Sequence, residues 1–221
     1  MQVELNRIVN QEFGRRSFRE ITKMAKEKKM HDEKIRFGKY DWNVLDRQND
    51  RVLVITEKVI EKHPYHNDEC EITWETCDMR KYLNSEFYNA FSESDRVRII
   101  EVTTENPDNP WDGTNGGNPT TDNIFLLSID EIVRYFGDSG KLQTKQFGPK
   151  GEAWWFDDQY DGVRSAKFGS KNAWWWLRSP GYISSRAAYI PINGNVHLHG
   201  EPAKSRNGGV RSALWLKDGE N

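Results

Sequence analysis

Hydrophobic and polar residues alternate with a period of two from residue 35 onward, which is the pattern of half-buried strands. The alternation runs through segments 35–44 and 52–54, and Asn49-Asp50 lies between them. Asn and Asp favour tight turns, so this dipeptide predicts the connection between two strands. The apolar members of the pattern are Ile35, Phe37, Trp42, Val44, Val52 and Val54.

A helical period replaces this alternation after residue 75. From Glu75 to Phe91, apolar residues recur at every fourth position, which predicts one helix with a single buried face. Ser92 is placed to cap a short second helix, which we expect to reach Ile100. Ser128 and Glu131 form a capping box for a third helix that ends at Gly137. The apolar face of the first helix comprises Met79, Leu83, Phe87 and Phe91.

The order of these elements predicts the domain organisation and the fold class. Residues 1–34 carry many charges and apolar residues at mixed helical spacings, which predicts a helical extension. This extension packs on the main domain or meets a protein partner, and the sequence leaves both open. Residues 35–217 form the main domain. Strands, then helices and long loops, then further strands indicate an α+β fold with helices segregated from an antiparallel sheet.

Apolar residues alternate again around Asn193-Gly194, which predicts a hairpin. A two-residue turn would mix apolar and polar side chains on one face. A three-residue loop, 193–195, instead pairs Ile192 with Val196 and Ile190 with Leu198, and gathers the aliphatic side chains on one side. We therefore expect the three-residue loop, with Asn195 tolerating its left-handed conformation. The opposite face then holds Tyr189, Pro191, His197 and His199.

Two aromatic-rich blocks, 174–181 and 208–215, bracket a segment rich in Ser, Asn, His, Arg and Tyr. A stiff frame around adaptable residues is typical of a binding surface, so residues 182–207 are the predicted ligand-binding segment. The expected anchors are Tyr182, Tyr189, His197 and His199. The expected polar contacts are Ser184, Ser185, Arg186, Asn193, Asn195, Lys204 and Arg206. The expected frame residues are Trp175, Trp176, Arg178, Arg211 and Trp215.

The frame residues favour core packing over a sugar-stacking platform. On a strand, Trp175 points away from Trp174 and Trp176, so three consecutive Trp residues cannot face one ligand. We expect one face of this strand to be buried and the other partly exposed. Arg178 and Arg211 are expected to stack on the rings or to pair with a buried carboxylate, which are structural roles.

Composition narrows the class of protein. The chain has 221 residues, 36 % hydrophobic and 30 % charged, with a net charge of −2. This composition is that of a soluble globular protein, and the absence of a basic stripe argues against a nucleic-acid partner. No window approaches the roughly 18 apolar residues of a membrane span, and the N-terminus has no apolar signal region. We therefore expect no membrane partner and a cytoplasmic or virion-associated protein.

Candidate metal sites are weak. His197, His199 and Glu201 alternate along one strand face and could hold a transition metal, which would make the protein a metal-assisted enzyme. The polar residues around them do not provide the dry surroundings of such a site, so a solvated pair of histidines is favoured. Cys70 and Cys77 are expected to be free thiols, since zinc would need further ligands from His63 or His66. Four residues of a long loop could hold calcium, but a turn-rich loop needs them anyway: Asp112, Asn115, Asn118 and Asp122.

No Ser-His-Asp set, P-loop or dinucleotide fingerprint is present, so no cofactor is expected and an enzyme is not favoured. The blocks 175–181 (WWLRSPG), 187–188 (AA), Gly194 with Val196, and 209–215 (GVRSALW) resemble an uncharacterised bacterial and phage family. Its members read GVRPALW in the last block, where this chain has Ser212. The resemblance covers about 35–217, with further matching blocks at 37–45, 74–77, 80–84 and 125–128.

The ending of such proteins is similar to the C-type-lectin-like fold of formylglycine-generating enzymes and of the variable proteins of diversity-generating retroelements. This resemblance implies paired terminal strands, near Ile35 and Val210, and a variable surface at 182–207. Formylglycine chemistry needs a close Cys pair late in the chain, and Cys70 and Cys77 lie too early. The resulting hypothesis is a non-enzymatic module that binds a protein or glycan. The alternatives are the metal-assisted enzyme and a phage or assembly structural protein.

Overall fold

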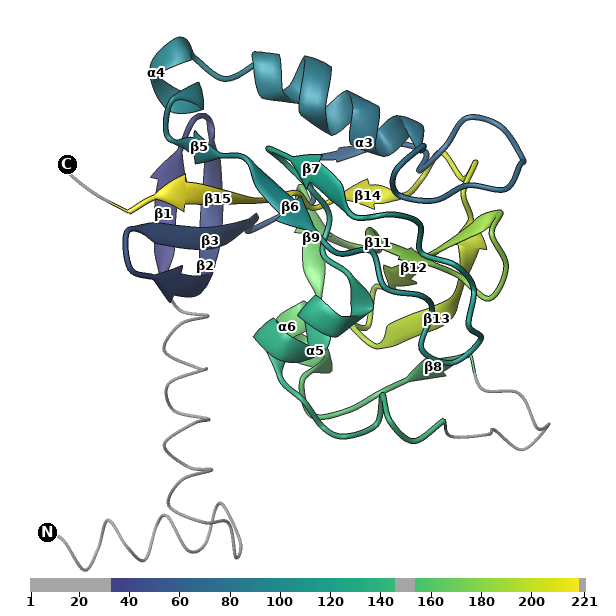
Figure 1. Ribbon diagram of the computed structural model, residues 1–221. Helices are drawn as coiled ribbons and strands as arrows, with labels where there is room; N and C mark the ends of the chain where they lie inside the picture. The colour runs from purple at the N-terminus through teal and green to yellow at the C-terminus, as the bar shows by residue number, and fades with distance from the viewer. Residues whose placement is uncertain (1–32, 146–153, 219–221) are drawn as a thin grey trace, which may run out of the picture.

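The computed structural model describes residues 33–145 and 154–218, which form two sheets lying side by side (Figure 1). The predicted helical extension therefore lies outside the described residues, except for its last two positions. A helical segment runs along one end of the two sheets, and two shorter helices lie at the opposite end (Figure 1). Among the described residues, no helix is both long and apolar enough to span a membrane.

The first sheet has five antiparallel strands in the order β1-β2-β3-β15-β5. Their bounds are β1 (Lys34–Phe37), β2 (Tyr40–Gln48), β3 (Arg51–Thr56), β15 (Ala213–Lys217) and β5 (Ile99–Ile100). The predicted turn at Asn49-Asp50 is confirmed: it joins β2 to β3, and Asn49 has a φ of 51°. Trp42, Val44 and Val54 are fully buried in this sheet, as their alternation predicts.

The second sheet has six strands in the order β4-β14-β11-β12-β13-β8. Its strands are β4 (Glu61–Lys62), β14 (Gly209–Val210), β11 (Trp175–Pro180), β12 (Arg186–Ile190), β13 (Val196–Pro202) and β8 (Trp155–Phe156). Only β11 and β14 run parallel within it. Two small hairpins complete the strands: β6 (Val102–Thr104) with β7 (Thr120–Asp122), and β9 (Ala166–Phe168) with β10 (Lys171–Ala173).

Two of the places where the chain crosses between the two sheets are neighbours. One crossing leads from β3 to β4 and the other from β14 to β15; β3 pairs with β15, and β4 with β14. The backbone N–H of Thr56 donates to the carbonyl of Ser212 at 3.0 Å and ties the two crossings together. Arg211 lies between β14 and β15 and therefore at the junction of the sheets.

The helices are shorter than predicted, although their buried faces are correct. α3 (Asp78–Tyr82) begins after Cys77, whose Sγ accepts from the backbone N–H of Arg80, and continues into a π-helical turn, η1 (Leu83–Phe87). α4 (Glu93–Arg96) ends early, so the prediction that it reaches Ile100 is wrong. Ile99 and Ile100 form β5 instead, because they pair with β15 at the sheet edge. α5 (Ile129–Phe136) has the predicted capping box and ends at Gly137, and α6 (Asp161–Arg164) was not predicted.

The predicted α+β class with a C-type-lectin-like fold is wrong. Strands take 35 % and helices 16 % of the described residues, so the domain is mostly β. The terminal strands do not pair either: β1 and β15 share a sheet but are separated by β2 and β3, and Val210 lies in β14 against β4. Many strands have only two or three residues, which is too short for alternation to reveal them. The sequence patterns therefore overestimate the share of helix in the domain.

The predicted hairpin exists between β12 and β13, but its register near the turn is wrong. Tyr189 pairs with His197, so residues 191–195 form a five-residue connection, and Ile192 is 56 % exposed. Ala187 pairs with Glu201, and a bulge separates the two pairs. The bulge shifts the register by two residues, so the side chains of β12 and of residues 196–199 stay on their predicted faces, whereas Ile192 lies exposed in the connection. Four aliphatic residues are accordingly buried: Ala188, Ile190, Val196 and Leu198.

Gly194, rather than Asn195, takes the left-handed conformation in this connection, with a φ of 90°. A Cβ atom at Gly194 would lie 1.8 Å from the carbonyl oxygen of Asp161 in α6, so only glycine fits. Arg164, also in α6, donates from Nε to the carbonyl of Gly194 at 2.8 Å. The connection is therefore fixed against α6, which explains why its turn differs from a free hairpin loop.

Candidate functional site

Seven aromatic rings form a continuous strip across β8, β12 and β13, and we call this set the aromatic strip. His197 and His199 alternate with buried residues on β13, so both project from the same sheet face. Trp155 on β8 pairs with His197 on one side, and Tyr189 on β12 pairs with it on the other. In spatial order the members are Tyr182, His199, Trp154, Trp155, His197, Tyr189 and Trp174.

Each histidine of the aromatic strip is held between two other rings. His199 stacks on Tyr182, with ring centroids 3.8 Å apart, and lies 4.8 Å from Trp154. His197 stacks on Trp155 at 5.7 Å and on Tyr189 at 4.7 Å. Cross-strand neighbours on one face of a sheet make such contacts. The faces of the imidazole rings are therefore covered, and their edges point outward.

Burial changes the charge of this surface. It lowers the pKa of His197 to about 4, and the positive charges of His199 and Arg186 act in the same direction. His197 is therefore neutral at pH 7. Burial also raises the pKa of the Tyr189 hydroxyl, and Glu201 adds to that effect. His197 and Tyr189 are therefore neutral at physiological pH, with Arg186 and Glu201 as their charged neighbours.

A pocket of about 370 Å³ adjoins one end of the aromatic strip. Trp174 and Tyr189 contribute its aromatic wall, and Glu201 accepts a hydrogen bond from the Ser205 hydroxyl at 2.9 Å. The exposed Arg206 lines the same pocket. A concave surface with an aromatic wall and a few polar groups is suited to hold a protruding side chain of a ligand.

The structure brings the four predicted anchors together in the aromatic strip, but the predicted polar contacts separate. Arg186 lies over the Tyr182 ring, with 5.5 Å between the guanidinium carbon and the ring centroid. Asn193 is exposed on the connection between β12 and β13. Asn195 is only 8 % exposed, so little of its side chain is accessible to a ligand. It is buried because Gly194 before it packs against α6.

Three further predicted contacts lie in a separate group. Lys204 forms an ion pair with Glu69. Ser184 and Ser185 are half-buried, and their carbonyl groups accept backbone hydrogen bonds from Ile72 and Ala203. These three residues therefore contact the loop before α3 and the end of β13. They take no part in the ring contacts of the aromatic strip.

Sequence analysis missed three members of the aromatic strip: Trp154, Trp155 and Trp174. Trp154 and Trp155 are 39 % and 46 % exposed, and Trp174 contacts Tyr189 with a centroid distance of 5.2 Å. β8 has two residues, so no periodicity marks it as a strand. The available signal was the pair of tryptophans itself, in a polar stretch where no core element is evident.

The frame residues are buried, whereas Trp174, directly before Trp175, is partly exposed. Trp175 and Trp176 are both fully buried, because β11 lies inside the six-stranded sheet and both of its faces are covered. Arg178 is 4 % exposed; it pairs with Glu131 and donates to Asn106. Carbonyl groups of Glu105 and Leu126 accept two more of its N–H groups. Trp215 is 8 % exposed, and Arg51 lies over its ring at 4.5 Å.

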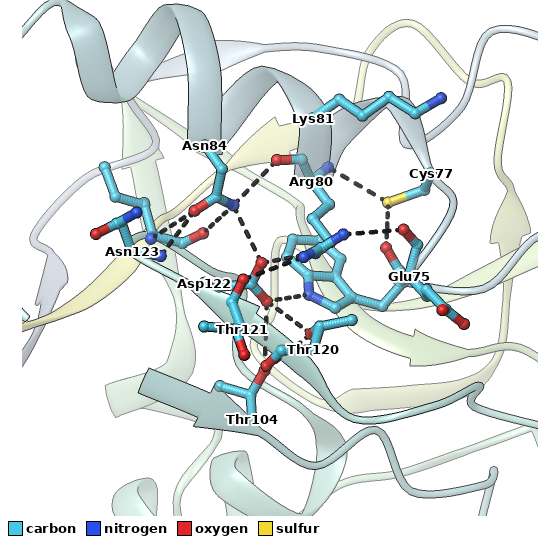
Figure 2. A network of polar contacts seen from close by, with 12 residues as sticks. Glu75, Cys77, Arg80, Lys81, Asn84, Thr104, Thr120, Thr121, Asp122 and Asn123 are labelled. Atoms are coloured by element: carbon cyan, nitrogen blue, oxygen red, sulfur yellow. Dashed lines mark hydrogen bonds and ion pairs between the residues drawn. The ribbon is translucent and has the colours of Figure 1, made fainter. Parts of the chain in front are cut away.

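The loop residues that could hold calcium have separate partners in the structure. Asp122 is fully buried, and its carboxylate accepts from Arg80 Nε at 2.6 Å and from Trp74 Nε1 at 2.9 Å (Figure 2). Thr120 donates its hydroxyl to the same carboxylate at 2.7 Å (Figure 2). Asp112 instead pairs with Lys145. The Asp122 carboxylate is therefore saturated with donors and ties α3 to the β6–β7 hairpin.

Among residues 33–145 and 154–218, no group of three His, Cys, Asp or Glu side chains is arranged to hold a metal ion. The alternative metal site at His197, His199 and Glu201 is thus not assembled, because Gly200, with a φ of 80°, lies in the bulge before Glu201. Cys70 is an exposed free thiol. Cys77 is buried, and burial raises its pKa to about 12.

Comparison with known proteins identifies the family. A family model described as "Domain of unknown function (DUF6273)" matches residues 49–218. Searches of curated proteins and of solved structures found no match. The expected resemblance to an uncharacterised domain family is confirmed at this level. Because the matched region covers more than half of the chain, this protein belongs to the DUF6273 family.

Proposed function

We propose that this domain is a non-enzymatic binding module that contacts a protein partner through the aromatic strip. The observation that supports the proposal is the exposure of large aromatic side chains on one face: Trp154 (39 %), Trp155 (46 %) and Tyr182 (37 %). Soluble proteins seldom expose large apolar side chains in one contiguous patch unless the patch has a partner. Trp, Tyr and Arg are also the residue types that dominate the energy of protein interfaces.

The ring arrangement favours a protein over a glycan. A pyranose stacks on the open face of an aromatic ring, whereas the faces of His197 and His199 are covered by neighbouring rings. Two residues of the segment 182–207, Ile183 and Ile192, expose aliphatic surface. Such surface suits contact with a protein better than contact with a sugar. Ring edges, aliphatic side chains and Arg186 together match the composition of a protein interface.

The proposal can be tested by placing a photo-crosslinking amino acid in the full chain, in the cells that produce it. One variant carries the crosslinker at Trp155, and a matched control carries it at Phe168, which is 41 % exposed but lies outside the aromatic strip. We expect a discrete covalent adduct from position 155 and none from position 168. The adduct partner is then purified, and its affinity for the wild type and for Trp154→Ser/Trp155→Ser is compared.

A loss of affinity of at least about tenfold in the double variant, with an unchanged melting temperature, supports the proposal. Equal affinity of the two proteins for the purified partner contradicts it. A glycan array is the competing experiment: binding of a defined oligosaccharide that the same double variant abolishes would assign the aromatic strip to a glycan.

We further propose that residues 182–207 are a variable surface of the kind rewritten by a diversity-generating retroelement. Support comes from exposure: the positions expected to vary are half-buried or exposed, whereas Ile190, Val196 and Leu198 are fully buried. Substitution at exposed sites usually changes stability by less than about 0.5 kcal/mol, so such sites can vary. The positions are Tyr182, Ser184, Ser185, Arg186, Tyr189, His197 and His199.

Flanking DNA tests this second proposal. We expect a nearby reverse transcriptase and a near-copy of the DNA that encodes 182–207, with mismatches only at template adenines. The codons of Ile190, Val196 and Leu198 should be identical in both copies. A locus without a repeat removes the retroelement and leaves the binding proposal standing on its own test.

A further inference from the structure

Among the described residues, three arginines are almost completely buried, and only two of these three are matched by carboxylates. Arg164 pairs with Asp158 and Asp161, and Arg178 pairs with Glu131. The third, Arg211, is 2 % exposed and donates from Nε to the carbonyl of Thr56 at 2.8 Å. Within the described part of the chain, its Nη1 has no hydrogen-bond partner. Burying a charged donor without an acceptor costs several kcal/mol, so this group is expected to meet a ligand.

Arg211 lines a pocket of about 650 Å³ where the two sheets meet the β9–β10 hairpin. A volume of this size is within the range of small-molecule sites. The pocket shares no lining residue with the pocket beside the aromatic strip. It is therefore a separate site, and its evidence does not depend on the proposed protein interface.

The charges that line the pocket are mostly positive. Four cationic side chains face one carboxylate, which belongs to Glu57. Glu57 Oε1 accepts from Lys34 Nζ at 2.7 Å, so this carboxylate already has a lysine partner. Lys58 and Lys167 are exposed, and neither forms an ion pair with another described residue. An excess of positive charge around a concave surface attracts anions.

The guanidinium of Arg211 is held in a fixed position at this site. Its central carbon lies 5.0 Å from the Trp175 ring centroid and 5.6 Å from that of Phe136, within the range of cation–π contacts. Burial lowers the pKa of Arg211 to about 10, which still leaves the group charged at pH 7. A planar, fixed guanidinium with an unpaired N–H group is suited to donate hydrogen bonds to the oxygen atoms of a carboxylate or phosphate.

Neighbouring buried polar atoms also lack hydrogen-bond partners. The side-chain oxygens of Asn43, Thr56 and Ser212 are buried, and none has a hydrogen-bond partner among the described residues. Asn43 lines the pocket, and Thr56 and Ser212 belong to the two chain crossings beside Arg211. Buried polar groups are nearly always satisfied in folded proteins, so a cluster of unsatisfied ones marks a site where a ligand or water belongs.

We propose that this pocket binds a small organic anion, with its carboxylate or phosphate on Arg211 and its apolar body against Phe136 and Val163. Lys58 and Lys167 at the edge of the pocket add long-range attraction for the anion. Phe136 and Val163 both line the pocket and provide the apolar contact. The two headgroups share the chemistry of an oxyanion, and the experiment separates them.

Calorimetric titration of the full chain tests the proposal, with phenyl phosphate, benzoate and neutral benzyl alcohol as probes at constant ionic strength. We expect saturable binding of at least one of the two anions in the millimolar range or tighter, and none of benzyl alcohol. The stronger of the two anions identifies the headgroup. Absence of saturable binding by both anions, or equally tight binding of benzyl alcohol, overturns the proposal.

Two variants locate the bound anion. Arg211→Met should weaken binding by more than about tenfold, because it removes the charged donor. Lys58→Ala/Lys167→Ala changes only exposed residues and should weaken binding by roughly threefold at low salt, with less effect at high salt. The matched control is Lys81→Ala/Lys204→Ala, two exposed lysines outside the pocket, which should leave affinity unchanged.

These variants also decide the question if Arg211→Met fails to fold. Equal loss of affinity in the two lysine pairs would mean non-specific attraction and would overturn the proposal. Full affinity in a folded Arg211→Met protein would do the same. A loss confined to the Lys58 and Lys167 pair supports the site without any substitution in the core.

Discussion

Arg178 and Arg211 are buried to the same degree, but the acceptors around them differ. Arg178 pairs with Glu131 and donates to Asn106 and to two backbone carbonyls. Arg211 donates to one carbonyl, that of Thr56, although two aromatic rings hold its guanidinium in place. The two arginines therefore have the same residue type and burial, but Arg178 has four hydrogen bonds to the protein and Arg211 has one.

This difference distinguishes a buried arginine that stabilises the fold from one that binds a ligand. A guanidinium has five N–H donors, and a residue that serves only the fold is expected to have them accepted by the protein. Arg178 has acceptors for four of its five N–H groups, and these partners come from distant parts of the chain. Arg211 leaves donors next to a pocket, which is the arrangement of a binding residue. The predictions below test whether this distinction holds.

The largest effect on stability is expected from replacing Arg178, the buried arginine with four hydrogen bonds to the protein. Arg178→Met should destabilise the protein by about 3–5 kcal/mol, because it leaves the carboxylate of Glu131 and several acceptors without a donor. Arg211→Met should cost no more than about 1 kcal/mol, since it removes one hydrogen bond together with an unmatched buried charge. Urea unfolding of both variants measures the difference. Equal destabilisation would mean that Arg211 is as structural as Arg178.

The buried carboxylate of Asp122, which accepts hydrogen bonds from several donors, extends the comparison. Asp122→Asn keeps the shape of the side chain but removes the charge that Arg80 and Trp74 contact (Figure 2). We expect a loss of about 2–4 kcal/mol in the free energy of unfolding. The control is Asp41→Asn, whose pair with Arg36 is more than half exposed and should contribute less than about 1 kcal/mol. A small loss of unfolding free energy in Asp122→Asn would show that a full set of hydrogen-bond donors does not identify a charged residue that stabilises the fold.

Sequence analysis succeeded where one local rule decides the outcome. The Ser128–Glu131 capping box and the Asn49-Asp50 turn depend on residues close in the chain, and the structure has both. The faces of β12 and β13 were also predictable, because a register shift of two residues leaves them unchanged. Elements of two or three residues, such as β5 and β8, carry no periodicity and could not be predicted.

The candidate sites show the same limit. Tyr189 and His197 were recognised because alternation places them on one face, but Trp155 joins them only through β8, which pairs with β13 across a long stretch of sequence. Arg211 was interpreted as structural because its block is aromatic and apolar. Whether a buried arginine is satisfied depends on residues brought from elsewhere, here Thr56 and Glu57, and no local pattern reports that.

A smaller effect, dependent on pH, is expected at His197, another buried polar group. Its Nδ1 has no hydrogen-bond partner within the described residues, and its pKa is lowered from 6.5 to about 4. The unfolded chain therefore binds the proton more tightly, so stability falls as the pH drops below 6.5. This contribution amounts to about 2 kcal/mol at pH 5 relative to pH 8.

Unfolding free energies of the wild type and His197→Gln, measured between pH 8 and pH 5, test this expectation. The wild type should lose more stability over that range, because glutamine does not take up a proton. Parallel curves for the two proteins would show that His197 keeps an ordinary pKa, and would remove the argument that this side chain is neutral at pH 7. Other titrating groups affect both proteins equally and cancel in the comparison.

The smallest effect on stability is expected at the exposed aromatic surface. Trp155 is 46 % exposed, and its main contact is the stack on His197, so Trp155→Ser should change the free energy of unfolding by no more than about 1 kcal/mol. The adjacent Phe156 points into the core with 2 % exposure, and Phe156→Ala should cost about 3–5 kcal/mol. Thermal melts of the two variants provide the measurement. A large loss at Trp155 would mean that the aromatic strip stabilises the fold, and its exposure would then give no support to a protein partner.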